Sequence, residues 1–368
     1  MENGKIKLAI IGTQGIPNQY GGFESLVEHI AKYLSGQFDI TIFCSSKVYS
    51  EKLPEVYGCR LRYLPFKANG VQSIPYDIIS ILQSVKKYDR ILILGSSGGV
   101  ILPLLKKYRH KLILNFGGMD WKRSKWSRFA KSFLKLSESL AVKNCGDLVA
   151  DNACIQQYIK QEYKRQSVLI EYGGDHVTNE IINERDTEKY PFLKNKYALS
   201  VARIQPDNNI EMILDAFRED APVPIVFIGN WNGSSYGEEI KKKYSGLNNI
   251  ILLDAIYDQK ELNKIRSNCA VYIHGHSAGG TNPSLVEAMC LGLPIICYAS
   301  GFNQSNTEHK ALYFKDGPEL RNLLDTDNAK LLKLGSDMKA IAERRYKWQM
   351  IAQKYADCIK GDGKSSLN

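Results

Sequence analysis

The chain has 368 residues, of which 44% are hydrophobic and 24% charged, and its net charge is +10. This length exceeds what one ordinary hydrophobic core takes up, so two domains are expected. The composition is typical of a soluble globular protein and excludes a disordered chain, and no apolar run is long enough to cross a bilayer. The positive charge favours an anionic partner, which leaves open nucleic acid, an acidic membrane surface and a phosphorylated small molecule.

Residues 5–11 form a near-continuous apolar run that predicts the first strand, and the short polar lead before it predicts no signal peptide. A glycine-rich loop follows over residues 12–22, and residues 23–34 have the periodicity of an amphipathic helix. This is the first βα turn of a doubly wound domain, a common place for phosphate binding. The GxGxxG fingerprint is absent because Gly12 and Gly15 are three residues apart, which disfavours a nicotinamide cofactor.

Further apolar segments in the first half predict a parallel sheet covered by helices on both faces. These segments are residues 39–44, 60–64, 90–95, 111–116, 148–150 and 168–171. The loops SSGG at 96–99 and GG at 117–118 end two of these strands. Ligands bind at the carboxyl ends of such strands, so both loops are candidates for a ligand site; a tight turn is the alternative for each.

Residues 177–190 are polar and aperiodic, which predicts a linker, after which the alternation of strands and helices resumes as a second doubly wound domain. The predicted strands there are residues 197–202, 224–228, 249–253, 270–274, 294–298 and 311–314, the predicted helices are 210–218, 236–244, 259–267 and 284–291, and a last helical stretch covers 329–359. We expect two domains, over residues 1–176 and 177–345, facing a central cleft, and a C-terminal helix and tail over 346–368.

Residues 274–294 (HGHSAGGTNPSLVEAMCLGLP) are the most informative stretch of the chain. They predict a strand end, a glycine loop and a helix capped by Ser284 or Asn282. A helix N-terminus behind a glycine loop presents free N–H groups, which suit a diphosphate. Glu287 lies about one turn into this helix, where its carboxylate would bind ribose hydroxyls. An ordinary βα unit with a solvated glutamate is the alternative.

Residues 121–140 (WKRSKWSRFAKSFLKLSESL) combine tryptophan with basic residues and predict an amphipathic helix. On a helix, one face would carry Trp126, Phe129, Ala130, Phe133 and Leu140. The opposite face would carry Lys125, Arg128, Lys131 and Lys135. This pattern is typical of a membrane-surface element. The alternative is a helix packed on its own domain with a solvated basic face.

Eight scattered cysteines without a CxxC pair predict reduced thiols and no zinc site. Asp325 and Asp327 have the spacing of a DxD metal site but lie late in the chain on a polar turn. We therefore expect no metal and no resident cofactor. His274 and His276 are expected to border the cleft.

Four blocks of the sequence resemble the rhamnosyltransferase-like group of retaining GT-B glycosyltransferases, which build bacterial cell-surface polysaccharides from nucleotide-activated sugars. The blocks are IIGTQGIPNQYGGFESLVEHIAKYL, NFGGMDWKRSKWSRF, VARIQPDNNIE and GGTNPSLVEAMCLGLPI. They follow the order of the family and span nearly the whole chain. The resemblance implies an α/β fold of the GT-B type, with two Rossmann-like domains and a C-terminal helix that crosses back to the first domain.

The resemblance also implies site residues. Arg203 would pair with the donor diphosphate, and Glu287 would bind the nucleotide ribose. Asp120 would orient the transferred sugar. The remaining donor-binding residues would be Gly21, Gly22, Gly279, Gly280, Thr281 and Asn282. The resemblance also implies that Trp121, Lys122 and Arg123 shape the acceptor site, and the basic amphipathic pattern adds Lys125, Trp126 and Arg128 as acceptor and membrane residues.

The chain departs from the family pattern at three places. The wider superfamily has a glutamate eight residues before the ribose-binding one, and this chain has Gly279. Its usual lysine after the arginine is replaced here by Asn208 or Asn209. Relatives often carry histidine or aspartate where this chain has Gly117. These departures put the donor sugar, and the strength of the activity, in question.

The implied reaction is transfer of L-rhamnose from dTDP-L-rhamnose, with retention, onto a lipid-linked saccharide. Arg203 and the backbone N–H groups of residues 280–284 would stabilise the leaving diphosphate without a metal. The expected location is the cytoplasm, on the inner face of the plasma membrane and bound to its anionic surface, with no nucleic-acid partner.

Two other classes of function remain open. A sugar-nucleotide epimerase of the same two-domain plan would need acid and base side chains in the cleft, and the loop over residues 12–22 supplies none. A non-catalytic basic protein that binds polyanions would need aromatic residues interleaved with basic ones on an open face.

Overall fold

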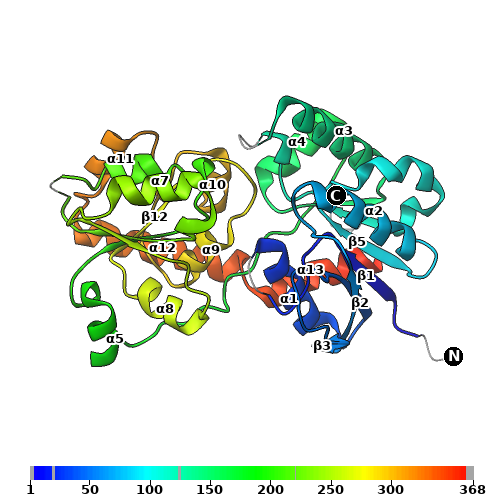
Figure 1. Cartoon of the computed structure of the whole chain (residues 1–368), viewed down its shortest axis with the longest axis horizontal. Coiled ribbons are helices and arrows are strands. Elements are labelled where there is room, and N and C mark those ends of the chain that lie inside the picture. Colours follow the sequence, from blue (N-terminus) through cyan, green and yellow to red (C-terminus); the bar gives the residue numbers. More distant parts are fainter. Residues whose placement is uncertain (1–3, 19–20, 123–125, 220, 362–368) are drawn as a thin grey trace. The chain divides into compact units, whose positions relative to one another are not determined.

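Two β-sheets, each flanked by helices, form the framework of the chain in a computed structural model (Figure 1). The structure describes residues 4–18, 21–122, 126–219 and 221–361. Unit 1 comprises Met1–Glu171 and Gln349–Asn368, and unit 2 comprises Tyr172–Trp348. The chain therefore passes from unit 1 into unit 2 once and returns once.

The sheet of unit 1 has eight strands in the order β3-β4-β2-β1-β5-β6-β7-β8. Their bounds are Lys7–Ile11 (β1), Asp39–Ser45 (β2), Glu55–Val56 (β3), Cys59–Leu64 (β4), Arg90–Leu94 (β5), Leu112–Asn115 (β6), Asp147–Ala150 (β7) and Val168–Leu169 (β8). Neighbouring strands are parallel except β3, which pairs with β4 in antiparallel fashion. The seven strands predicted in this half are confirmed, and β3 is an additional two-residue strand.

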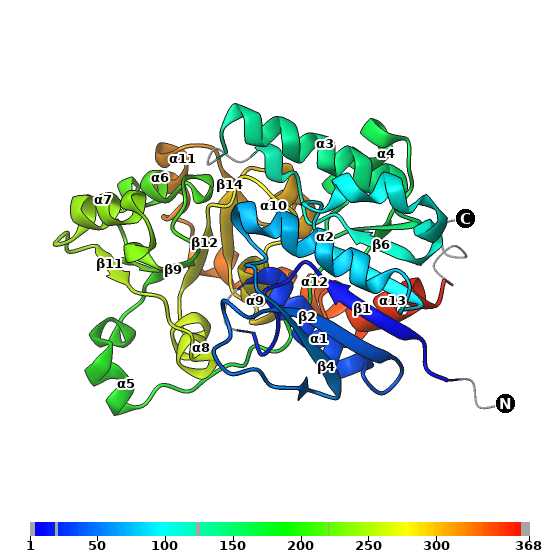
Figure 2. The same ribbon diagram turned by 45° about the vertical axis from the view of Figure 1, so that its right-hand side comes forward.

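Helices cover both faces of this sheet, and Figure 2 shows α2 on one side of β1 and α1 on the other. Their bounds are Gly22–Leu34 (α1), Ser73–Ser84 (α2), Arg128–Asn144 (α3) and Ala153–Tyr163 (α4), with 3-10 turns at Gly70–Gln72 (η1), Gly99–Lys111 (η2) and Asp120–Lys122 (η3). The last four residues of β1 are fully buried. A continuous apolar run is therefore required there, because neither face of the strand contacts water.

The sheet of unit 2 has six strands in the order β11-β10-β9-β12-β13-β14, and every pair is parallel. Their bounds are Ala198–Val201 (β9), Ile225–Ile228 (β10), Ile250–Leu253 (β11), Val271–His274 (β12), Ile295–Tyr298 (β13) and Leu312–Phe314 (β14). Alternate residues belong to separate buried clusters, with Val226 in one and Phe227 in the other. All six predicted strands are confirmed.

The helices of unit 2 connect and cover these strands. Their bounds are Glu184–Lys189 (α5), Ile210–Asp215 (α6), Ser235–Tyr244 (α7), Gln259–Ser267 (α8), Pro283–Cys290 (α9), Gly301–Asn306 (α10), Gly317–Leu323 (α11) and Asn328–Arg345 (α12), with 3-10 turns at Pro191–Lys194 (η4), Pro206–Asn208 (η5) and Trp231–Gly233 (η6). Across residues 4–18, 21–122, 126–219 and 221–361, no helix has the length and apolarity needed to span a membrane.

Two sequence-based expectations about helices were wrong. The predicted linker contains α5, which forms because Asn183 and Asp186 make a capping box that satisfies the first N–H groups. The single helical stretch predicted over residues 329–359 is two helices, α12 and α13 (Trp348–Lys360). The break falls at Tyr346, whose buried side chain donates a hydrogen bond to the Asn306 carbonyl (2.8 Å).

The part of α13 from Gln349 onward groups with unit 1. The amide of Asn115, at the end of β6, donates to the Tyr355 hydroxyl (2.6 Å), and both side chains are buried. Arg90 also donates to the Cys358 carbonyl (2.9 Å). The last helix therefore completes the core of unit 1.

Candidate functional site

The candidate site in unit 2 begins at α9, which follows β12 after a loop rich in glycine. The Asn282 side chain caps this helix by accepting a hydrogen bond from the Ser284 N–H (3.0 Å). Gly292 ends the helix with a positive φ of 73°. Of the two candidate caps, Asn282 is confirmed, and α9 presents its N-terminus at the carboxyl end of β12.

Glu287 is held by two side chains that the sequence did not indicate. Its Oε2 lies 2.7 Å from Nη2 of Arg266, which is 1% exposed, and its Oε1 lies 3.3 Å from Nε2 of His176. The Glu287 side chain itself is 12% exposed. Glu287 is therefore an oriented carboxylate in a partly buried ion pair, and the solvated glutamate of the alternative interpretation is wrong.

Arg203 follows β9, which pairs with β12, so its loop adjoins the loop that precedes α9. Asn208 joins the two loops: its amide donates to the Arg203 carbonyl (2.6 Å), and its Oδ1 lies 2.8 Å from Nδ1 of His276. Ser277 adds a backbone bond to the Asp207 carbonyl (2.9 Å). These contacts bring the predicted diphosphate arginine and the predicted glycine loop to the same edge of one sheet.

The Arg203 side chain is exposed, and it makes no hydrogen bond or ion pair with another residue that the structure describes. Asn208 therefore does not act as a second charge, and its role is to hold the loop. A guanidinium in this position can donate parallel hydrogen bonds to a phosphate.

Gly279 departs from the superfamily glutamate for a geometric reason. Its φ is +129°, and a Cβ at this position would lie 2.8 Å from Nε2 of His276. A side chain here would therefore displace His276 and strain the backbone. Next to it, the Thr281 hydroxyl is buried and donates to Oδ1 of Asn306 (3.1 Å).

His274 is 3% exposed, so it borders no open surface of unit 2. Burial lowers the pKa of its imidazole to about 3, which keeps the ring neutral. Within the described part of the chain, its Nε2 has no hydrogen-bond partner. The expectation that His274 lines a cleft is therefore wrong, while His276 lies in the loop that carries Gly279.

In unit 1, the glycine-rich loop after β1 is organised by a carboxylate that sequence reasoning missed. Glu24 accepts hydrogen bonds from the Thr13 hydroxyl (3.0 Å) and the Gln14 N–H (2.8 Å). Gly21 has a φ of +142°, and a Cβ on it would lie 1.9 Å from Oε2 of Glu24. Gly21 thus lets the first turn of α1 fold back on the loop, and Gly22 is the first residue of that helix.

Gly117 follows β6 and is one of the expected departures from the family pattern. Its φ is +63°, and a Cβ there would lie 2.5 Å from Cζ of Phe23. The Phe23 ring also approaches Gly95, where an added Cβ would lie 3.7 Å from it. Phe23 therefore fills the space above the ends of β5 and β6, and this explains the departure at Gly117.

The predicted acceptor block is only partly described. Asp120 begins the 3-10 turn η3, and Arg123 and Lys125 lie outside the described residues. The Trp121 ring lies 4.9 Å from the Lys135 ammonium and 5.4 Å from that of Lys122. Arg128 is the first residue of α3, and Trp126 lies two residues before it.

The basic stretch forms its helix later than predicted, because α3 begins only at Arg128, and the residues that α3 buries lie outside the predicted apolar face. Its buried residues are Ser137, Glu138, Ala141, Val142 and Asn144, whereas Phe129 is 85% exposed. Lys135 is only partly exposed, and its ammonium lies over the rings of Tyr158 (5.0 Å) and Tyr163 (5.2 Å). A buried carboxylate, Glu138, attracts the lysine inward (3.3 Å).

A buried carboxyl group, Asp77, lies beside the predicted SSGG loop. Asp77 accepts a hydrogen bond from the Ser97 hydroxyl. A Cβ added to Gly98 would lie 2.7 Å from the Cβ of Asp77. Burial raises the pKa of the Asp77 carboxyl to about 7, and bonds from Ser97 and the Gly98 backbone oppose that rise. Sequence periodicity could not find this group, since aspartate on an amphipathic helix ordinarily faces water.

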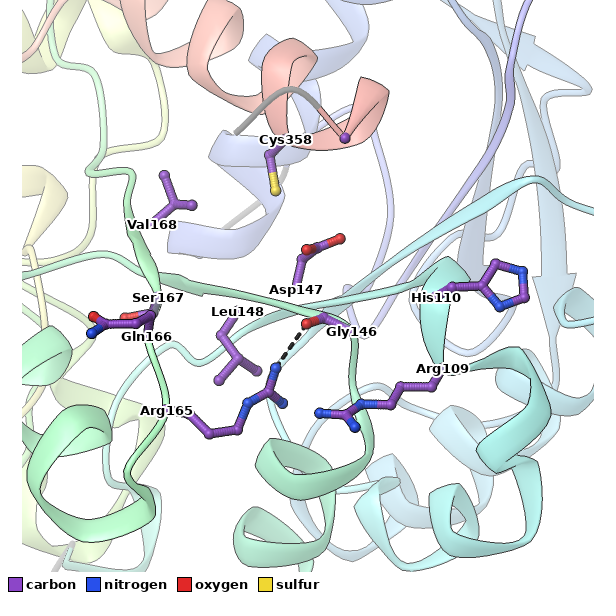
Figure 3. A pocket seen from close by; sticks show the side chains of 11 residues that line it. Arg109, His110, Gly146, Asp147, Leu148, Arg165, Gln166, Ser167, Val168 and Cys358 are labelled. Carbon is purple, nitrogen blue, oxygen red and sulfur yellow. Dashed lines mark hydrogen bonds between the residues drawn. The ribbon is translucent and has the colours of Figure 1, made fainter. Parts of the chain in front are cut away.

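A hollow of about 580 Å³ lies at the opposite, amino-terminal edge of the sheet of unit 1 (Figure 3). Arg109 and Arg165 both donate to the Cys145 carbonyl, at 3.2 and 2.6 Å, just beyond the end of α3. Burial and the neighbouring Arg109 charge lower the pKa of Arg165. These guanidinium groups cap the carboxyl end of a helix, so the hollow is not the predicted ligand site.

Among the described residues, no group of three or more His, Cys, Asp or Glu side chains has the arrangement of a metal site. The eight cysteines are unpaired, and six of them are buried.

Family profiles match both halves of the chain. Residues 182–347 match the glycosyl transferases group 1, and residues 5–175 match a domain of unknown function, DUF1972. An uncharacterised glycosyltransferase of Methanocaldococcus jannaschii is 24% identical over 95% of this chain and 97% of its own length. Protein CapJ of Staphylococcus aureus is 28% identical over 32% of this chain and 30% of its own length.

Solved structures with the same fold include sucrose-phosphate synthase of Thermosynechococcus elongatus, with a TM-score of 0.82, 17% identity, and coverage of 98% of this chain and 100% of that one. HepE of Anabaena in complex with UDP-glucose has a TM-score of 0.74, 17% identity, and coverage of 97% and 100%. These similarities confirm the predicted fold class, which is α/β with two Rossmann-like sheets of the GT-B type.

Proposed function

Because residues 182–347 match the family model of the glycosyl transferases group 1, we propose that this chain transfers a sugar, with retention, from a nucleotide-sugar donor to a saccharide acceptor. The observation that carries the proposal is the oriented Glu287 carboxylate in α9, behind the glycine loop that Asn208 joins to the Arg203 loop. A carboxylate accepts hydrogen bonds from both ribose hydroxyls, and the helix N-terminus offers N–H groups to a diphosphate.

In this reaction the bond between the anomeric carbon and the phosphate oxygen breaks while the acceptor oxygen bonds to the same face of that carbon. The acceptor proton passes to the leaving phosphate oxygen, so no side-chain base is required. Arg203 and the N–H groups of residues 280–284 stabilise the negative charge that develops on the diphosphate. Asp120 orients the transferred sugar, and Gly21 and Gly22 let the first glycine loop approach it.

We propose dTDP-L-rhamnose as the donor, on the resemblance of the four sequence blocks. The HepE complexes contain UDP and UDP-glucose, so the uridine nucleotides are the principal competitors. Calorimetric titration with dTDP, UDP and GDP separates the bases. We expect Arg203→Ala and Glu287→Ala each to weaken the preferred nucleotide at least tenfold, because each removes charge-assisted hydrogen bonds.

The same variants test the function itself. Release of the nucleoside diphosphate only in the presence of a lipid-linked saccharide supports transfer. Interconversion of sugar nucleotides without an acceptor would show an epimerase instead. Wild-type turnover in both Arg203→Ala and Glu287→Ala would refute the proposed site.

We also propose that the acceptor is lipid-linked and that unit 1 binds an anionic membrane surface from the cytoplasmic side. Phe129 and Leu136 on α3 are 85% and 54% exposed, and Leu104 on the adjoining η2 is 78% exposed. Arg128 and Lys107 are exposed on the same two elements. Apolar side chains among basic ones suit the headgroup region of an anionic bilayer.

Sedimentation with phosphatidylglycerol vesicles at low salt tests this surface. We expect Phe129→Asp to reduce vesicle binding severalfold, because a carboxylate replaces an inserted ring. Ile181→Asp is the matched control, since Ile181 is 90% exposed but lies in unit 2. Equal loss in both variants, or wild-type binding by Phe129→Asp, would refute this membrane surface.

A further inference from the structure

The two segments through which the chain enters and leaves unit 2 are bonded to each other. Entry is at Tyr172 and exit is at Trp348. The Gly174 N–H donates to the Tyr346 carbonyl (2.8 Å), and the Trp348 N–H donates to Oδ1 of Asp175 (2.8 Å). A Cβ on Gly173 would lie 2.5 Å from the Trp348 ring, which is 2% exposed. The two segments therefore form one packed junction.

The indole of Trp348 selects which ring nitrogen of His176 accepts a hydrogen bond. Its Nε1–H donates to Nδ1 of His176 (3.0 Å). An indole nitrogen can only donate, so Nδ1 of His176 must be the unprotonated, accepting nitrogen. The proton of the neutral ring is therefore on Nε2, the nitrogen that lies 3.3 Å from Oε1 of Glu287.

The junction also packs directly against the helix that carries Glu287. A Cβ on Gly174 would lie 2.8 Å from Cγ1 of Val286 and 3.0 Å from the Glu287 backbone nitrogen. Arg266 holds the other carboxylate oxygen from within the core of the unit. The Glu287 carboxylate is thus held at Oε2 by a buried guanidinium and approached at Oε1 by His176.

We propose that His176 is a positioning residue for the nucleotide-binding carboxylate and that Trp348 acts through it by fixing its tautomer. The proposal rests on the proposed role of Glu287 and deepens it. With the opposite tautomer, two N–H donors would face each other at Trp348, and a ring lone pair would face Glu287. The carboxylate would then lose its support on one side, and its preorganisation for ribose would fall.

Two variants of His176 separate the two nitrogens. In His176→Gln the amide N–H₂ replaces Nε2 and still reaches toward Glu287. In His176→Asn the shorter side chain replaces Nδ1, so it accepts from Trp348 but no longer reaches Glu287. We expect His176→Gln to retain most nucleotide affinity and His176→Asn to lose about 3- to 10-fold, the usual effect of one hydrogen bond.

Trp348→Phe removes the indole N–H while keeping an aromatic ring. We expect it to raise the KM for the donor about 3- to 10-fold with kcat unchanged, because the ribose is bound equally in the ground and transition states. The increase should disappear in the His176→Gln background, since glutamine needs no tautomer to be set. Trp231→Phe is the matched control, because Trp231 is also buried in unit 2 and donates its indole N–H to the Leu253 carbonyl (2.8 Å).

The decisive measurement is a double-variant cycle on donor KM and on the dissociation constant of the nucleoside diphosphate. The proposal is supported if Trp348→Phe raises these constants in the wild-type background but not in the His176→Gln background, and if Trp231→Phe leaves them unchanged. The same effect in both His176 backgrounds, or no effect at all, overturns it. Glu287→Gln distinguishes failure of the proposed site from failure of the role of His176. Wild-type nucleotide affinity in Glu287→Gln refutes the proposed site. Weakened affinity in Glu287→Gln, together with wild-type affinity in Trp348→Phe, refutes only the role of His176.

Discussion

Glu287 depends on Arg266, a guanidinium that is buried on the apolar side of α8 together with Leu262 and Ile265. A buried arginine is stable there only because the carboxylate compensates its charge. We expect Arg266→Gln to destabilise unit 2 by about 3 kcal/mol, the usual cost of leaving one partner of a buried pair. Urea unfolding measures this change.

Arg218 provides the control for that prediction. It pairs with Asp215 at 3.7 Å, and its side chain is 49% exposed. Surface pairs of this kind contribute less than about 1 kcal/mol, so Arg218→Gln should leave unfolding almost unchanged. Equal effects of the two substitutions would mean that the Arg266–Glu287 pair does not stabilise the unit.

Asp77 predicts a pH dependence of stability. Its carboxyl has a pKa of about 7 in the folded chain, above the ordinary value of about 4 for an unfolded aspartate. The folded state therefore binds this proton more strongly, and the stabilisation present below pH 4 is lost as the pH rises toward 7. Between pH 5 and pH 8, the free energy of unfolding should therefore fall less in Asp77→Asn than in the wild type.

Urea unfolding at both pH values measures the difference, which we expect to be about 1–3 kcal/mol. Asp325→Asn is the control, since its carboxylate is 63% exposed. If Asp77→Asn and the wild type lose the same stability between the two pH values, the Asp77 carboxyl does not carry this dependence.

At the scale of elements, the junction of β6 with α1 decides which residue is allowed at position 117. Gly117→Ala adds a methyl group 2.5 Å from Phe23 at a positive φ, and we expect it to cost about 2–4 kcal/mol. Combining it with Phe23→Leu should restore part of this loss, because the clash disappears while the backbone strain stays. Thermal unfolding of both variants tests this coupling.

Gly58→Ala isolates the backbone contribution. Gly58 has a φ of +75°, but an added Cβ would meet only Ser35 at an ordinary 3.5 Å. Its substitution should therefore cost about 1 kcal/mol, the lower end for a strained residue. A Gly117→Ala variant no less stable than Gly58→Ala would contradict the steric role of Phe23.

At the scale of the whole molecule, two tyrosines near the α12–α13 break belong to different cores. Tyr346 is buried in a cluster of unit 2, and Tyr355 is buried against Asn115 of unit 1. We expect two calorimetric unfolding transitions, one for each unit. Tyr346→Ala should lower the midpoint temperature of one transition and Tyr355→Ala that of the other, because each substitution removes about 3–5 kcal/mol of stability from its own core.

The nucleotide provides the internal check on this division. A ligand that binds the folded unit 2 should raise the midpoint temperature only of the transition whose midpoint Tyr346→Ala lowers. If both tyrosine variants lower the same transition, or if the nucleotide raises the one that Tyr355→Ala lowers, the two helices do not separate the cores in this way.

Strands that are buried on both faces were predictable from the sequence. The last four residues of β1 and all of β10 are apolar and buried, so a short apolar run identifies these strands without tertiary information. The face of α1 was predictable for a related reason, since Leu26, Val27, Ile30, Ala31 and Leu34 repeat with the period of a helix and all five are buried. The packed face of α3 was not, because a buried carboxylate, Glu138, lies on it and pairs with the partly exposed Lys135.

The Asn282 cap was predictable from the local sequence, since it lies just before a helix that follows a parallel strand. The assignments of Glu287 and Arg203 as donor-binding residues stay predictions. The sequence did not identify His176, Arg266, Glu24 or Asp77, whose partners described above lie 10 to 172 residues away along the chain. Local patterns such as periodicity, caps and glycine loops are determined over a few residues, and the sequence by itself determined them. Which polar groups meet inside the folded chain depends on how distant segments pack, so only the tertiary structure decided the supports of the site.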